Sequence, residues 1–303
     1  MNPRTGVSAV DGVFVIDKPE GLTSHDVVSR LRRIARTRRV GHLGTLDPIA
    51  TGVLPLVVGR ATRLAQFYTR SDKTYEGRIR FGIATDTYDR AGTPAGPEIP
   101  PAFSREELER QLDRFRGEFL QTPPPVSAKK VEGVRAYELA RKQIPVTLEP
   151  VPVIIYELDL LSFELPYAVL RIRCSGGTYM RSLAHDLGEA LGCGAHLESL
   201  RRTAAGEFSI GQAHTLEDLA QLAAEDRLVE ALIPAAQVLP SFPAVYVESL
   251  LIGQIRQGRN FPVSPFRTGS TSTRYVKAIS REGELIAIGE AKLPNLYHPI
   301  IVF

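Results

Sequence analysis

The segment YAVLRIRCSGGTYMRSLAHDLGEALGCG (Tyr167–Gly194) contains a strand, a tight turn and a helix in immediate succession. Thr178 is the expected N-cap, because a threonine oxygen satisfies free amide groups at a helix start, and Gly192 is the expected stop. Apolar side chains recur at helical spacing and predict one buried face, formed by Met180, Leu183, Leu187 and Leu191. The segment therefore predicts a strand that leads directly into an amphipathic helix.

Arg181 has an unusual position in this helix. Counted from Thr178 it is the third helical residue, where a cation is disfavoured by ~0.3–1 kcal/mol because the helix N-terminus is already partly positive. An arginine there suggests an anionic partner, either a carboxylate or a phosphate. The alternative is a surface arginine that bends toward solvent.

The flanking sequence alternates between apolar runs and helix-capping signals. Strands are expected at Val13–Ile16, Gly52–Gly59 and Thr74–Gly82, and helices are expected to begin at Thr23, at Arg60 and at Ser104, the last ending at Gly117. Residues 84–102 are expected to form a loop, and residues 120–150 a flap over a ligand. A proline-rich linker follows at 234–243, and residues 245–303 have the pattern of a small β-rich domain.

Composition excludes several classes of function. A chain of 303 residues is long enough for about two domains. No apolar run is long enough for a membrane span, and the N-terminus lacks the layout of a signal peptide, so a cytoplasmic location is expected. The two cysteines and six histidines form no metal-ligand pattern. Walker A, GxSxG, HExxH and dinucleotide-binding motifs are absent, which disfavours nucleotide hydrolysis, serine hydrolysis and zinc chemistry.

Positive charge is concentrated in one segment. The net charge is only +3, yet SRLRRIARTRR (Ser29–Arg39) carries six arginines and no acid. Such a local field suits a polyanionic partner. The alternative is a solvated helix face.

The segment GHLGTLDPIATGVLP (Gly41–Pro55) places a single carboxylate, Asp47, among glycines and aliphatic side chains. Asp-Pro commonly begins a turn, so a structural role is one interpretation. The other is a nucleophile or base for chemistry at a sugar carbon. A hydrolase with paired carboxylates would need a second acid, and no neighbouring motif offers one. If Arg181 contacts Asp47, the ion pair holds the carboxylate ionised and fixes its orientation.

Two tyrosines and one histidine lie near these motifs. Tyr75 and Tyr179 are placed to stack on a base, with half-buried core positions as the alternative. His42 is either a polar contact to a base or a structural histidine.

Five stretches, two of which include segments quoted above, carry a resemblance to a known family. They are VDGVFVIDKPEGLTSHDVV, RVGHLGTLDPIATGVLPLVVGRATRL, SDKTYEGRIRFG, FRGEFLQTPPPVSAKKVEGVRAYELAR and CSGGTYMRSLAHDLGEALGCGAHLESLRRTAAGEF. In this order they resemble the bacterial tRNA pseudouridine-55 synthases, the TruB family, over residues from about 11 to 240. Departures from the family pattern are Lys129, Arg63 and Gly176.

The resemblance implies a fold and a reaction. The fold is α+β, a pseudouridine synthase catalytic domain (1–240) with a mixed, largely antiparallel central sheet and an RNA-contacting flap, followed by a PUA-like RNA-binding domain (245–303). The reaction is the isomerisation of uridine 55 in the TΨC loop of tRNA to pseudouridine, without cofactor or metal. The implied enzyme is a cytoplasmic monomer that needs no guide RNA or protein partner.

The resemblance also implies roles for individual residues. Asp47 matches the essential aspartate, Arg181 its ion-pair partner, and Tyr75 the tyrosine that packs on the target base and helps to remove the C5 proton. Around the substrate, the matched or expected contacts are His42, Tyr179, Leu200, Lys18, Lys130, Tyr137, Arg201 and Arg202, the last two at phosphates. The expected contacts to the RNA backbone are Arg30, Arg33, Arg36, Arg38 and Arg39.

The sequence leaves the chemical route and some alternatives open. The target base must leave its stack to be reached, and Asp47 then either attacks the sugar carbon, adds to the uracil ring or removes a sugar proton. A non-catalytic tRNA-binding chaperone would use the same surface. The flap and the short C-terminal domain disfavour a guide-RNA-dependent relative. The lack of a second carboxylate in a neighbouring motif disfavours a hydrolase.

Overall fold

The computed structural model describes residues 11–126, 130–131, 134–135, 148–263 and 273–303. The helices are α1 (Ser24–Ile34), α2 (Arg105–Asp113), α4 (Met180–Ala190), α5 (Leu216–Ala224) and α6 (Ser249–Arg256), with 3-10 helices η1 (Gly59–Tyr68), η2 (Ile210–Gln212) and η3 (Leu228–Ala231). Within the described ranges, no helix has both the length and the apolar character needed to cross a membrane.

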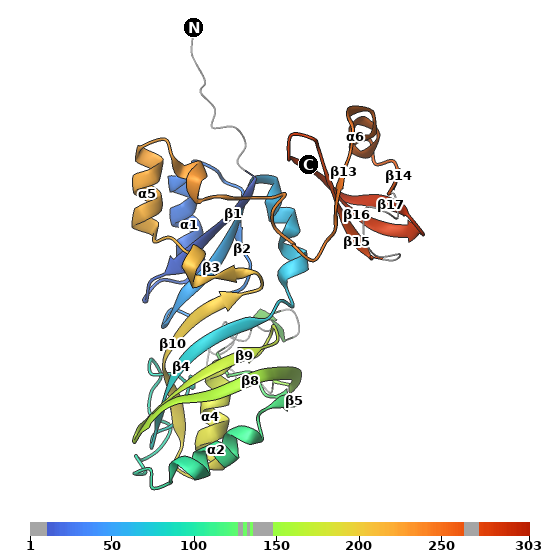
Figure 1. Ribbon diagram of the computed structural model, residues 1–303. Helices are drawn as coiled ribbons and strands as arrows, with labels where there is room; N and C mark the ends of the chain where they lie inside the picture. Colours follow the sequence, from blue (N-terminus) through green and yellow to red (C-terminus); the bar gives the residue numbers. More distant parts are fainter. Residues whose placement is uncertain (1–10, 127–129, 132–133, 136–147, 264–272) are drawn as a thin grey trace.

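A mixed sheet forms the centre of the molecule (Figure 1). Its strands, in the order in which they pair, are β12 (Ile233–Pro234), β1 (Gly12–Lys18), β3 (Ala50–Val58), β10 (Ala195–Ala205), β4 (Lys73–Phe81), β9 (Tyr167–Cys174), β8 (Val151–Glu164) and β5 (Gly117–Gln121). Two short strands extend this order: β2 (Val40–His42) pairs with β3, and β11 (Phe208–Ser209) pairs with β10. Only β3 and β10 pair in parallel among these strands. The expected mixed, largely antiparallel sheet is confirmed.

Helices cover this sheet in two groups. In Figure 1, α2 and α4 lie against β4, β9 and β8, whereas α1 and α5 lie beside β1 and β2. Leu183 and Leu187 of α4 belong to the same buried cluster as Leu170 and Ile172 of β9. The strand-to-helix segment seen in the sequence therefore forms part of the main core.

The remaining strands lie outside the central sheet. The C-terminal sheet has the order β13 (Ala244–Tyr246), β15 (Tyr275–Ile279), β16 (Leu285–Leu293), β17 (Leu296–Val302) and β14 (Phe261–Pro262), and β6 (Lys130–Val131) pairs with β7 (Val134–Arg135). Ile288 and Ile301 of the C-terminal sheet share a buried cluster with Val57 of β3 and Leu64 of η1. The C-terminal sheet is thus a separate layer that packs directly against β3 and η1.

Local signals placed most elements correctly. Thr23 caps α1, and the reciprocal bonds with Asp26 are both present. The helix predicted from Ser104 ends at Asp113 rather than at Gly117, where β5 begins. The helix predicted after Gly59 is the 3-10 helix η1.

The predicted cap of α4 is wrong by one residue. Tyr179 is the N-cap, because the Thr178 hydroxyl donates to the carbonyl of Ser175 at 2.9 Å and stabilises the preceding turn instead. Arg181 is consequently the second helical residue, still within the first turn.

Candidate active site

The loop that carries Asp47 connects β2 to β3 and is held from two sides. The Ser24 hydroxyl at the start of α1 donates to the carbonyl of Leu46 at 3.1 Å and accepts from its amide at 2.8 Å. The Lys18 ammonium donates to the carbonyl of Leu22 at 2.6 Å and lies 3.5 Å from that of Pro48. These bonds fix the backbone on both sides of Asp47.

Arg202 supports the same loop from the protein interior. Its guanidinium donates to the carbonyls of Val53, Gly44 and Thr45 at 2.7, 3.1 and 3.3 Å. The residue is only 1% exposed. Three of its donors are therefore used inside the protein, and the expected contact of Arg202 with a phosphate stays a prediction.

Asp47 and Arg181 form the ion pair that the sequence predicted. Arg181 Nε lies 2.9 Å from Asp47 Oδ2, and the two side chains are 8% and 41% exposed, respectively. The guanidinium also donates to the carbonyls of Thr87 and Val126 at 3.2 and 2.9 Å. A buried, multiply bonded arginine thus orients a carboxylate that is still open to a ligand.

Asp89 is a second carboxylate at this arginine. Its Oδ2 lies 3.5 Å from Arg181 Nη1, and its Oδ1 accepts bonds from the Thr87 hydroxyl at 2.8 Å and the Ala91 amide at 3.0 Å. Asp89 was not among the predicted site residues, because it occurs in the Gly-, Pro- and Thr-rich stretch 84–102, whose composition predicts only a loop. The repeated acids of TDTYDRAG were the available signal.

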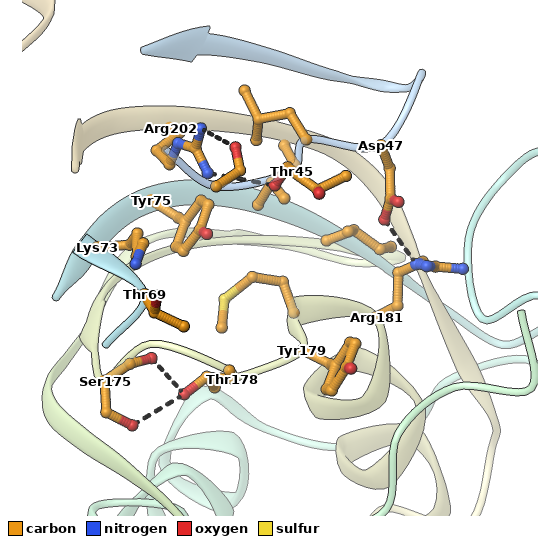
Figure 2. A pocket seen from close by; sticks show the side chains of 16 residues that line it. Thr45, Asp47, Thr69, Lys73, Tyr75, Ser175, Thr178, Tyr179, Arg181 and Arg202 are labelled. Atoms are coloured by element: carbon orange, nitrogen blue, oxygen red, sulfur yellow. Dashed lines mark hydrogen bonds and ion pairs between the residues drawn. The ribbon is translucent and has the colours of Figure 1, made fainter. Parts of the chain in front are cut away.

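A cavity of about 270 Å³ opens beside Asp47 (Figure 2). Predicted site residues in its wall are Asp47, Tyr75, Tyr179, Arg181, Leu200 and Arg202, and further lining residues include Thr69, Lys73, Ser175, Thr178 and Met180. The fold thereby brings together side chains from the β2–β3 loop, β4, β10 and the start of α4. Lys73 was not among the residues predicted for the site.

The tyrosines of the cavity are held firmly. Tyr75 is 8% exposed, and burial raises its phenol pKa, although the Arg202 guanidinium acts in the opposite direction. The backbone of Tyr179 is held by Gln121, whose amide donates to its carbonyl at 3.0 Å and accepts from its N–H at 2.8 Å. Gln121 is therefore a further supporting residue that the sequence analysis missed.

His42 and Lys18 lie near the loop but do not line the cavity. The Nδ1 of His42 accepts from the Gly44 amide at 3.4 Å. Burial, followed by the charge of Arg202, lowers the pKa of His42, so its ring is neutral at pH 7. Lys18 is 0% exposed, and burial lowers its pKa to about 8. The expected substrate contact of Lys18 is therefore corrected: its ammonium binds backbone carbonyls under the loop.

The remaining predicted RNA contacts have different outcomes. The arginines Arg30, Arg33, Arg36, Arg38 and Arg39 are all exposed on α1 and the turn after it. Arg201 is partly exposed and pairs with Asp17 at 2.8 Å. Tyr137 lies outside the described residues, and the side chain of Lys130 is likewise not described.

Two of the three departures from the family pattern have structural roles. Arg63 donates to the carbonyl of Val302 at 2.8 Å and so joins η1 to the C-terminal sheet. Gly176 packs so tightly that an added Cβ would lie 3.0 Å from the carbonyl oxygen of Thr69. Lys129 lies outside the described residues.

Sequence comparisons agree with this geometry. The model of the TruB family pseudouridylate synthase N-terminal domain matches residues 32–180, and that of the tRNA pseudouridylate synthase B C-terminal domain matches residues 181–240. The tRNA pseudouridine synthase B of Solibacter usitatus (strain Ellin6076) is 65% identical over 97% of this chain and 100% of its own length. The chain belongs to the TruB family. It is accordingly a pseudouridine synthase, an isomerase that acts on tRNA.

Other TruB-family members and solved structures support the same assignment. The tRNA pseudouridine synthase B of Symbiobacterium thermophilum (strain DSM 24528 / JCM 14929 / IAM 14863 / T) is 47% identical over 83% of each chain. A chain in the crystal structure of a Cbf5–Nop10–Gar1 complex superposes with a TM-score of 0.72 at 26% identity, covering 97% of this chain and 85% of that one. The pseudouridine synthase fold is therefore confirmed.

Proposed function

We propose that this enzyme converts uridine 55 in the TΨC loop of tRNA to pseudouridine, with Asp47 as its catalytic carboxylate. The ion pair of 2.9 Å between Asp47 and the buried Arg181 carries the proposal. It places one oriented carboxylate at the mouth of a cavity in a TruB-family chain. In the part of the chain that the structure describes, no cluster of three or more His, Cys, Asp or Glu residues could hold a metal ion.

The target uridine enters this cavity by flipping out of the RNA loop. Flipping costs a few kcal/mol, and stacking on Tyr75 returns ~1–3 kcal/mol of that cost. Leu200 supplies an apolar wall to the same cavity. Asp47 then attacks the sugar carbon, adds to the uracil ring or removes a sugar proton, while Arg181 holds its orientation.

The exposed arginines of α1 and of the turn after it hold the RNA backbone in this proposal. Phosphate contacts by Arg and Lys position a nucleic acid without reading its sequence. The substrate is bare tRNA, bound by a cytoplasmic monomer without a guide RNA. Activity of the purified chain on transcribed tRNA, with no other macromolecule present, tests this part.

The decisive experiment measures tritium release from tRNA labelled at uracil C5, followed by mapping of the modified position. The wild type is expected to release one equivalent and to modify position 55, and Asp47→Asn to release none. Glu76→Gln is the matched control. Glu76 lies on the same strand as Tyr75 but does not line the cavity, and its substitution breaks a carboxylate–arginine pair with Arg171. This control is expected to react at the wild-type rate.

The results also separate the alternatives. Full activity of Asp47→Asn would contradict the catalytic role of Asp47. Modification at another uridine would contradict the assignment of position 55. Tight tRNA binding by the wild type without tritium release would support the chaperone interpretation, and free uracil in the products would support a hydrolase.

A further inference from the structure

Lys73 places a buried cation in the same cavity as Asp47. We propose that its ammonium donates a hydrogen bond to a carbonyl oxygen of the flipped uracil and stabilises the negative charge on the base while it is detached from the sugar. Lys73 is then a further catalytic residue. This inference rests on the proposed function and adds the group that handles the leaving base.

The hydrogen bonding of Lys73 leaves one donor for a ligand. The residue is 7% exposed, and lysine is seldom this buried unless it is paired. Its ammonium donates to the carbonyl of Ser71 and, at 3.2 Å, to the hydroxyl of Ser71. Both acceptors are neutral, and no carboxylate in the described part of the chain lies within 4.0 Å of it. An ammonium has three donors, so a third remains beside the cavity.

The position of Lys73 suits contact with a base stacked on Tyr75. The two residues are separated by one position on β4, and alternate residues of a strand point to the same face. Both line the cavity. Figure 2 shows Lys73 on the side of Tyr75 away from Asp47. A sugar held at Asp47 with its base against Tyr75 therefore extends toward Lys73.

The surroundings strengthen any interaction of this ammonium with negative charge. Burial, and secondarily the charge of Arg202, lowers the pKa of Lys73. A cation stripped of water interacts more strongly with an anionic partner than a solvated one does. The anionic partner in this proposal is a delocalised anion, which arises within the cavity only during the reaction.

The reaction produces such an anion. The C1′–N1 bond breaks, and its electron pair stays on the uracil, spread over N1, O2 and O4. After the ring turns, C5 forms the bond to C1′, leaving a hydrogen on C5 and a double bond between N1 and C6. The C5 proton then leaves to a base, N1 gains a proton, and no atoms are gained or lost overall. A donor to O2 or O4 favours the detached base over the bound uridine.

Lys277 provides a matched control. It is 5% exposed and donates to the carbonyls of Ala236 and Val238 at 3.0 and 2.8 Å. Like Lys73, it is a buried lysine bound to neutral oxygens, but it does not line the cavity. Substituting each by methionine removes an ammonium of similar burial, and only one of them faces the substrate.

The test combines protein and substrate changes. Single-turnover rates of pseudouridine formation are measured on a T-arm RNA with uridine, 2-thiouridine or 4-thiouridine at the modified position. Sulfur accepts hydrogen bonds weakly, so one thio substitution is expected to slow the wild type. Lys73→Met is expected to slow the uridine reaction about 10- to 100-fold and to abolish that thio effect. Lys277→Met is expected to keep both the rate and the effect.

Several results would overturn the proposal. These are a wild-type rate in Lys73→Met, a slow Lys73→Met that keeps the full thio effect, and the absence of any thio effect in the wild type. If Lys73→Met fails to fold, Lys73→Leu, which likewise lacks a donor, is measured with the same criteria. Failure of the proposed function is recognised separately, because the wild type would then form no pseudouridine at position 55 of the uridine RNA.

Discussion

Replacing Arg202 with methionine tests whether this arginine supports the loop that carries Asp47 or contacts RNA. The substitution removes the donor to the carbonyl of Val53, a residue that is 0% exposed. A buried acceptor left without a partner costs ~1–3 kcal/mol. The carbonyls of Gly44 and Thr45 lie nearer to solvent, and losing their bonds costs ~0.5–1.5 kcal/mol each. The free energy of unfolding is thus expected to fall by about 2–6 kcal/mol.

The assay compares Arg202→Met with Arg201→Met. At roughly 2–4 °C per kcal/mol, the melting temperature of Arg202→Met is expected to drop on the order of 10 °C. Its single-turnover rate is also expected to fall by about 100-fold if Asp47 moves by an ångström. The Arg201 side chain is 41% exposed and pairs with a partly exposed Asp17. Arg201→Met is therefore expected to lower the free energy of unfolding by less than about 1 kcal/mol.

Salt dependence of tRNA binding decides between the two roles. An internal Arg202 makes no phosphate contact, so Arg202→Met is expected to keep the wild-type slope of log affinity against log salt. A variant with wild-type melting temperature and a slope reduced by about 0.7–0.9 would refute the reasoning. It would show that the guanidinium leaves the carbonyls and binds a phosphate.

Three further predictions follow from other parts of the structure. The double variant Arg33→Gln/Arg38→Gln is expected to reduce the salt slope of tRNA binding by about 1.5, and an unchanged slope would exclude these exposed arginines from the interface. Burial raises the pKa of Asp186 to about 6, above its unfolded value, so this carboxyl destabilises the fold as pH rises from about 4 to 6. Asp186→Asn is therefore expected to gain stability over the wild type across that window in denaturant titrations, and a constant difference would contradict the assignment. Gln121→Leu removes both bonds to the Tyr179 backbone and is expected to cost about 1–3 kcal/mol and to slow catalysis; an unchanged melting temperature would refute this role.

Local signals in the sequence were sufficient for most of the elements around the site. The capping box of Thr23 and Asp26 predicts α1 because both partners lie within one helical turn. The ion pair of Asp47 and Arg181 was predictable for a different reason. A cation in the first turn of a helix is unfavourable without an anion nearby, and the sequence contained one isolated carboxylate in a glycine-rich loop.

The resemblance to the TruB family supplied the fold class, which the local patterns alone did not give. The N-cap of α4 shows that a local signal can also predict the wrong residue. Thr178 has the preferred side chain for an N-cap, yet its hydroxyl stabilises the turn at Ser175. Two local hydrogen bonds of similar strength compete there, and the path of the turn decides between them.

Local sequence patterns were enough to predict most of the elements, the arginine-rich helix and the ion pair of Asp47 with Arg181. Which of the adjacent Arg201 and Arg202 faces inward depends on the folded sheet, because alternate residues of a strand point to opposite faces and the register depends on distant partners. The tertiary structure also brought Asp89 to Arg181, and Lys73 into the same cavity as Asp47. These groups are far apart along the chain, and their interactions exist only once the β strands have paired and the helices have packed.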